Sequence, residues 1–249
     1  MRKAILSFLM CCSLLVHGQG KMNDSAIFVP LIQFSYAGQL PGGDLSARFG
    51  YNSNLALNFT VKTKTNWIYS VDFAYIFGNQ IRESMLDSIT TKVDHHVIDI
   101  NGELADVRFY ERGFSSTVWV GKLIPVFHSN PNSGLIINLG AGFMEHHIKI
   151  EDIANRSPQL AGNLKKGYDK LTNGPSVSEY IGYMFLSNNR YINFNVGFDF
   201  MQGFTQDRRD WDYQLMKKDD KQRVDMLSGI RVGWILPLYK RVLKDRYYY

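Results

Sequence analysis

Apolar and polar residues alternate without a break near the C-terminal end of the chain. Bulky apolar side chains occupy every second position from Ile192 to Phe200, and small, polar or acidic side chains lie between them. Successive side chains of a strand point to opposite faces, so this segment is predicted to be a β-strand with one apolar face. In a water-soluble sheet the polar face meets water, whereas in a membrane barrel the apolar face meets lipid and the polar face lines the interior.

The same alternation recurs at intervals along the chain, and the gaps between the runs alternate in length. Further runs occupy residues 32–37, 55–62, 69–77, 137–143, 181–185 and 230–234. Short gaps lie at 64–66, 128–134 and 188–189, and long polar gaps lie near 79–103, 151–175 and 206–222. Outer-membrane barrels have short periplasmic turns and long external loops. The pattern predicts an all-β protein, a transmembrane antiparallel up-and-down β-barrel, with eight strands near 26–37, 45–63, 67–78, 113–126, 135–150, 176–187, 190–205 and 223–238.

One segment leaves the strand count open. Leu104–Arg112 could extend the fourth strand outward or form a short helix in the second loop. If it and Val93–Ile100 are two further strands, the barrel has ten. Residues 95–102 could instead form a projecting hairpin that turns at Asn101-Gly102.

The N-terminus has the features of an export signal. Arg2 and Lys3 precede the apolar run Ala4–Val16, and small residues follow near Gly18. We therefore expect a signal peptide over 1–18 and a single barrel domain over 19–249. Cleavage there removes both cysteines of the chain, which leaves no disulfide and no thiolate nucleophile. No later segment is long and apolar enough to be a transmembrane helix.

Composition agrees with a barrel in an outer membrane. The chain has 14 Tyr and 16 Phe, and aromatic residues form the girdles of such barrels. The formal net charge of +5, which loses two basic residues with the signal, is too mild to indicate nucleic acid. The expected surroundings are outer-membrane lipid and lipopolysaccharide.

Charged residues at inward positions are the first candidate site. By strand parity these are Arg48, Asp72, Asp199 and Arg231, with Lys62 nearer a rim. The interior of an eight-stranded barrel is filled by side chains or holds one small ligand, which argues against a diffusion porin. Buried charges have to be paired, so we predict an ion-pair network that closes the lumen. A proton or ion pathway is the alternative.

Catalysis at the outer rim is a second possibility. His146 and His147 lie at the outer end of the fifth strand, with Glu145, Ser178 and Glu179 nearby in a plausible register. Adjacent histidines on a strand point to opposite faces, which weakens a shared catalytic role. His95 and His96, with Asp94, could instead bind a metal. No motif supports either arrangement, so we predict no enzymatic activity, no metal site and no cofactor.

Two of the long loops carry residue types that are typical of binding hot spots. These are Lys165, Lys166 and Tyr168 in one loop and Arg208, Arg209 and Trp211 in the next. They could dock a protein partner or contact lipopolysaccharide phosphates.

Several short motifs resemble a family of small outer-membrane β-barrel proteins from Bacteroidota. The motifs are Tyr110–Phe114, Gly121–Pro125, Asn130–Gly134, Lys166–Gly174 and Gly233–Lys240, followed by the Tyr-rich C-terminus. The resemblance covers the chain from about Ala26 to its end and implies the barrel fold and an outer-membrane location. It implies no catalytic residues. Such barrels often accompany larger envelope machines, which implies an accessory role.

The combined prediction is a non-enzymatic outer-membrane barrel that is a structural or accessory subunit of an envelope complex and docks through its external loops. The alternatives are a rim enzyme acting on lipid A or a peptide, and a soluble lipocalin-like binder.

Overall fold

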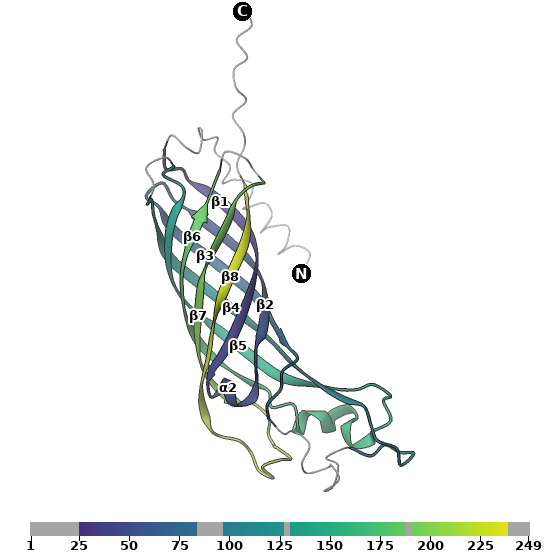
Figure 1. The fold of residues 1–249 in the computed structure, drawn as a ribbon. Coiled ribbons are helices and arrows are strands. Elements are labelled where there is room, and N and C mark those ends of the chain that lie inside the picture. The colour runs from purple at the N-terminus through teal and green to yellow at the C-terminus, as the bar shows by residue number, and fades with distance from the viewer. Residues whose placement is uncertain (1–24, 84–96, 127–129, 188–190, 239–249) are drawn as a thin grey trace, which may run out of the picture.

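The computed structural model describes residues 25–83, 97–126, 130–187 and 191–238, and these form a closed antiparallel barrel. Each strand pairs with the next one in the chain, and β8 closes the ring by pairing with β1 (Figure 1). The strands are β1 (Val29–Gly43), β2 (Asn52–Lys62), β3 (Trp67–Gly78), β4 (Val107–Ile124), β5 (Gly134–Asp152), β6 (Thr172–Phe185), β7 (Phe194–Asp207) and β8 (Gln222–Pro237). The prediction of eight strands is confirmed, and the ten-stranded alternative is wrong.

The segment that left the count open belongs mainly to the fourth strand. Residues 107–112 extend β4 outward and pair with the far end of β5. Beyond them, Ile98 and Leu104 form an isolated antiparallel bridge around a tight turn at Asp99–Gly102. This is the predicted small hairpin, as far as its residues 97–105 are described.

The predicted strand over 45–63 is wrong at its start. Gly43 has a φ of +58°, and a Cβ on it would lie 2.3 Å from the Val224 carbonyl oxygen. This left-handed residue turns the chain out of β1 and into the short helix α2 (Leu45–Arg48), so that β2 begins only at Asn52.

The two ends of the barrel differ. Three short connections, 63–66, 125–133 and 186–193, lie at what we call the turn end. Four connections, 44–51, 79–106, 153–171 and 208–221, lie at the loop end, where the 3-10 helices η1 (Pro158–Leu160) and η2 (Gly162–Gly167) also lie. β4 and β5 are the longest strands, with 18 and 19 residues, and their loop-end halves form an arm that leans away from the barrel axis (Figure 1).

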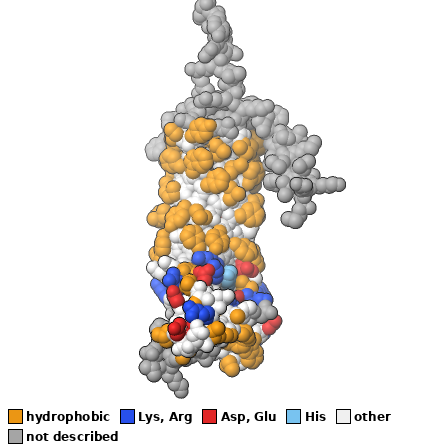
Figure 2. Space-filling view, turned by 90° about the vertical axis from the view of Figure 1, so that its right-hand side faces the viewer, with side chains coloured by type: hydrophobic (Ala, Val, Ile, Leu, Met, Phe, Trp, Pro, Cys, Tyr) orange, Lys and Arg blue, Asp and Glu red, His pale blue; other side chains and the backbone are white. Residues whose placement is uncertain are grey.

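The outer face of the barrel is apolar. Large hydrophobic side chains are exposed on every strand, among them Phe34, Leu57, Phe73, Val118, Leu139, Ile181, Phe198 and Ile230. On the face shown in Figure 2, hydrophobic side chains cover most of the barrel wall as a belt, and acidic, basic and histidine side chains gather directly below it toward the loop end. Within the described residues, no helix is long and apolar enough to span a membrane.

The interior contains two apolar clusters with polar side chains between them. The cluster at the turn end includes Leu31, Ile68, Trp119, Met184 and Ile235. The cluster at the loop end joins strand residues such as Ile76 and Met144 to loop residues such as Leu160 and Tyr168. The loops at that end are therefore packed into a cap with its own apolar core.

Candidate functional site

Arg231 of β8 lies at the centre of the lumen and contacts two carboxylates. Its Nη1 lies 2.5 Å from Asp72 Oδ2, and its Nη2 lies 2.8 Å from Asp199 Oδ2. Gln39 Nε2 also donates to Asp199 Oδ2 over 3.4 Å. All three charged side chains are at most 5% exposed. One guanidinium thus holds β3, β7 and β8 together from inside the barrel.

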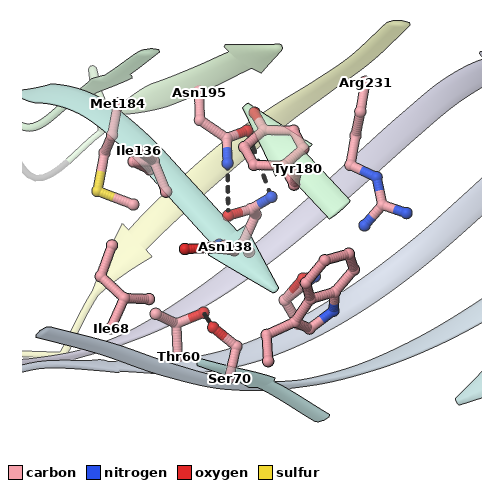
Figure 3. Close-up of a pocket in the computed structure, with 12 residues that line it drawn as sticks. Thr60, Ile68, Ser70, Ile136, Asn138, Tyr180, Met184, Asn195 and Arg231 are labelled. Atoms are coloured by element: carbon pink, nitrogen blue, oxygen red, sulfur yellow. Dashed lines mark hydrogen bonds between the residues drawn. The ribbon is translucent and has the colours of Figure 1, made fainter. Parts of the chain in front are cut away.

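A layer of neutral polar side chains separates this charged centre from the apolar cluster at the turn end. Gln33 and Asn195 exchange two hydrogen bonds, and Thr60 donates to Ser70 over 2.9 Å (Figure 3). The cavity among them measures about 30 Å³. A space of that size holds about one water molecule, so the lumen offers no continuous channel at this level.

Lys62 ends β2 inside the turn end and is fully buried. Its ammonium donates to Asn132 Oδ1 over 2.8 Å and reaches the carbonyls of Ile27 and Thr63 at 3.4 Å. Asn132 Nδ2 in turn donates to the Ser25 carbonyl. The lysine therefore joins the start of the described chain to the β4–β5 turn, and it lies near a rim as its position in the sequence predicts.

Arg48 does not join the central network. It lies in α2 rather than in a strand, its Nε is 3.3 Å from Glu83 Oε2, and its Nη1 donates to Thr172 Oγ1 over 2.8 Å. Its expected place among Asp72, Asp199 and Arg231 is therefore wrong. The reason is local, because the turn at Gly43 and the helix that follows break the strand parity on which that placement relied.

Lys170 connects three loops of the cap. Its Nζ lies 3.0 Å from both Glu83 Oε1 and Asp212 Oδ2, and its side chain is 4% exposed. Glu83 follows β3, Lys170 precedes β6, and Asp212 lies between β7 and β8. Because the partly exposed Glu83 also contacts Arg48, a single ion cluster ties all four loop-end connections together.

A second carboxylate ties the edge of the cap to the barrel wall. Asp44, between β1 and α2, accepts hydrogen bonds from the Val224 N–H and from Lys221 Nζ, both over 2.9 Å. The backbone N–H of Val224, with help from Lys221, lowers the pKa of the Asp44 carboxyl below its usual range. This carboxylate therefore stays charged and holds the loop ends of β1 and β8 together.

His146 and His147 point to opposite sides of β5. His146 is buried, with its Nε2 2.9 Å from Asp225 Oδ2, and Thr205 donates to the same carboxylate oxygen. The hydroxyl thus contacts the acid rather than the imidazole, and His146 Nδ1 has no partner among the described residues. Nucleophilic catalysis needs the hydroxyl next to its base, and that contact is missing here.

Of the other proposed rim residues, Glu145 is adjacent to these histidines, whereas Ser178 and Glu179 lie far from them. Ser178 is paired with Gly140 and Glu179 with Leu139, about six residues along β5 from His146. At about 3.3 Å per residue this is roughly 20 Å. The expected proximity of Ser178 and Glu179 is therefore wrong. Asp94, His95 and His96 lie outside the described residues, and no group of three or more His, Cys, Asp or Glu in the described part could hold a metal ion.

The predicted docking residues divide between the surface of the cap and its core. Tyr168 is 6% exposed and packs on Tyr213 at 5.0 Å between ring centroids, so its proposed surface role is wrong. Arg209 is bonded to Asp169, and Arg208 donates to Asn173 Oδ1 over 2.6 Å. Trp211 is 48% exposed, while Lys165 and Lys166 lie on the surface of η2.

Two clusters of exposed apolar residues mark the loop end. The first, which we call the arm patch, consists of Ile98, Ile100, Leu104 and Ile153. The second, the tip patch, consists of Trp211, Leu215 and Met216. Ile100 and Leu104 are 66% and 62% exposed, which is unusual for loop residues that meet only water.

Some of the buried charged residues could have been predicted from the sequence, and others could not. Asp225 has the same parity as Arg231 within the predicted last strand and could have been recognised as inward-facing. Glu111, which accepts two hydrogen bonds from Asn52 Nδ2, was missed because the fourth strand was expected to begin at 113. Lys170 lies in a loop, where no periodicity points to its partners.

Comparisons with known proteins give matches among solved structures only. Ail of Yersinia pestis, in complex with the heparin analogue sucrose octasulfate, is similar with a TM-score of 0.45 and 12% identity over 84% of this chain and 99% of that chain. The outer membrane protein OprG of Pseudomonas aeruginosa is similar with a TM-score of 0.40 and 12% identity over 86% of this chain and 99% of that one. No family model and no curated protein matches the chain. The resemblance to barrels of Bacteroidota therefore stays a prediction.

Proposed function

We propose that the protein is a closed, non-enzymatic outer-membrane β-barrel that serves as a structural or accessory subunit of an envelope complex. The observation that carries this proposal is the combination of a filled lumen with an ordered cap that exposes apolar side chains. A filled lumen leaves the barrel no use as a channel, so the surface at the loop end is where its function lies.

The outer face supports a membrane location. Aromatic residues Trp67, Tyr69 and Trp234 surround the turn end, and the apolar belt extends from there to the charged band. Transmembrane barrels have such a belt between two interfacial girdles. A lipocalin-like binder needs the reverse arrangement, with a polar exterior and an open apolar cavity, and is not favoured.

The arm patch is the docking surface that we favour. It lies on the 97–105 hairpin and on the residue that follows β5, next to the parts of β4 and β5 that extend past the barrel. Its four side chains are exposed and are not among the members of the apolar cluster at the loop end, which the neighbouring Val97 joins. Exposed apolar clusters on water-facing segments are typical of protein-binding sites. The partner is expected to be another envelope protein with an apolar surface of its own.

Two experiments test the proposal. The folded protein should require detergent and should migrate on a gel with a heat-modifiable shift, and a protein that is monodisperse without detergent would contradict the membrane location. A photo-crosslinking residue at position 100 should then yield one discrete adduct in intact cells. The same residue at position 215, in the tip patch, serves as the matched control.

Leu104→Asp should remove the position-100 adduct while leaving the heat-modifiable shift unchanged. Docking through the arm patch would be contradicted by an adduct that survives this substitution, or by equal adducts from positions 100 and 215.

A further inference from the structure

A small pocket opens on the outer face of the barrel where the apolar belt meets the charged band. Its walls include Arg112 and Phe114 of β4, Glu145, His147 and Lys149 of β5, and Tyr75 of β3. Arg112 lies directly opposite His147, and Phe114 lies directly opposite Glu145 in the β4–β5 pairing. The basic side chain of Arg112 and the acidic side chain of Glu145 therefore lie on the same outward face, on neighbouring strands and two residues apart in register.

Neither Arg112 nor Glu145 forms a direct ion pair with a residue that the structure describes. Arg112 Nη1 donates to the carbonyls of Glu111 and Gly78, and its guanidinium lies over the Tyr110 ring at 4.9 Å from the centroid. Within the described residues, Arg112 forms no ion pair. These contacts hold the guanidinium in place and leave its Nε and Nη2 without a hydrogen bond to any described residue.

Glu145 likewise has no ion-pair partner among the described residues. It accepts a hydrogen bond from Asn173 Nδ2 over 2.9 Å and forms no ion pair with a described residue. The other charges nearby are already matched, because Lys149 pairs with Glu151 at 3.1 Å and Arg209 pairs with Asp169. Among the described residues, a cation and an anion without an ion-pair partner thus lie side by side at the edge of the belt.

An apolar groove continues from this pocket along the outer face of the barrel toward the turn end. It is lined by Phe34, Leu55, Leu57 and Phe73, and it shares Tyr75 and Phe114 with the pocket. The two shared aromatic side chains make the polar pocket and the groove one continuous surface. The pocket at its loop end can accept charged groups, and the groove can accept a hydrocarbon chain.

We propose that this surface binds a zwitterionic phospholipid with a primary amine, the phosphate at Arg112, the ammonium at Glu145 and an acyl chain in the groove. Both charges of the headgroup are matched there, whereas a purely anionic lipid would place its phosphate at Arg112 and leave Glu145 beside it without a cation from the ligand. The inference rests on the proposed membrane location and adds to it a site with a defined ligand class.

Native mass spectrometry of the detergent-purified protein tests the site. Phosphatidylethanolamine, phosphatidylglycerol and phosphatidylcholine with identical acyl chains are added in equal amounts, and the wild type should retain phosphatidylethanolamine preferentially. Arg112→Gln should weaken that retention about tenfold, since a charge-assisted hydrogen bond contributes about 1.5–3 kcal/mol and 1.4 kcal/mol corresponds to a factor of ten. Glu145→Gln should abolish the preference over phosphatidylglycerol.

Matched controls come from the same outward face of the barrel. Lys122→Gln removes an outward cation of β4 near the turn end, and Glu179→Gln removes an outward carboxylate of β6 between Val177 and Ile181. Neither should alter lipid retention. Soluble phosphoethanolamine at the same concentration should not displace the lipid, because it lacks the acyl chain.

The proposal is overturned if the wild type retains the three lipids equally, if Arg112→Gln leaves retention unchanged, or if the controls reduce it as much. Displacement by soluble phosphoethanolamine would also contradict it. A heat-modifiable shift in every variant shows that the barrel is intact. Failure of the site is then distinct from failure of the membrane assignment, which would appear as loss of the detergent requirement.

Discussion

Arg231 shows why a buried charge in this barrel is both costly and hard to replace. Taking an arginine and two carboxylates out of water costs several kcal/mol per ion, and their mutual attraction offsets this only with good geometry. The contacts at 2.5 and 2.8 Å supply that geometry. While all three charges are present, Arg231 thus contributes little net stability. If Arg231 alone is replaced, two carboxylates remain buried in the lumen without a cation.

The first prediction follows from this asymmetry. Arg231→Met keeps most of the side-chain volume but leaves Asp72 and Asp199 buried without a cation. We expect it to lower the free energy of unfolding by about 3–5 kcal/mol. The measurement is urea unfolding in detergent micelles, followed by the heat-modifiable gel shift.

A compensated variant separates charge from packing. Asp72→Asn combined with Asp199→Asn and Arg231→Met removes all three charges and should recover most of the lost stability. If the single and triple variants are equally unstable, the loss comes from packing and the ion-pair explanation is wrong.

At the scale of elements, the cap is held by contacts between loops rather than by strand pairing. Lys170 touches carboxylates from two other connections, and the apolar cluster at the loop end joins strand residues to η1 and to the segment after η2. The loops are thus a packed layer in which each connection depends on the others. Removing one contact should loosen the layer without unfolding the barrel.

Lys170→Met tests this second prediction. The buried Asp212 and the partly exposed Glu83 would lose their shared cation. We therefore expect trypsin to cleave the loop-end connections at least about tenfold faster, given that an unpaired buried charge costs well over 1.4 kcal/mol. The heat-modifiable shift should remain. Lys149→Met is the matched control, because its exposed pair with Glu151 contributes about 0–1 kcal/mol. Equal protection of both variants would show that the cap does not depend on Lys170.

The elements also show how far sequence analysis reaches. Alternation is a local property, so the cores of seven of the eight strands and the inward positions of Asp72, Asp199 and Arg231 could be predicted from it. The fourth strand was predicted without such a run. The turn at Gly43 depends on a left-handed residue that lies against the Val224 carbonyl, which is a contact between segments distant in the sequence. Because this turn could not be predicted, the expected position of Arg48 was wrong. Lys170, Tyr168 and the Arg112–Glu145 pocket depend on loop packing or on the neighbouring strand, which a single segment does not reveal.

For the molecule as a whole, the lumen is closed at three levels along its length. The turn end is filled by the cluster around Trp119 and Leu123, the middle by Arg231 and its carboxylates, and the loop end by the cap. The ion pairs of Arg231 thus lie between two apolar clusters. Buried charges toward the two ends, such as Lys62 at the turn end and Lys170 in the cap, have polar partners of their own. An ion crossing it would have to displace side chains at each level.

The third prediction is therefore that the purified protein does not conduct ions. In planar bilayers the wild type should give no current steps above the lipid baseline, because an eight-stranded barrel filled by its own side chains leaves no aqueous path. A 16-stranded diffusion porin in the same preparation serves as the positive control. Lys170→Met should also stay silent, since the central ion pairs and the cluster at the turn end remain in place when the cap loosens. Discrete, voltage-stable openings of the wild type would show that the interior rearranges into a channel, and would favour the ion-pathway alternative for Asp72, Asp199 and Arg231.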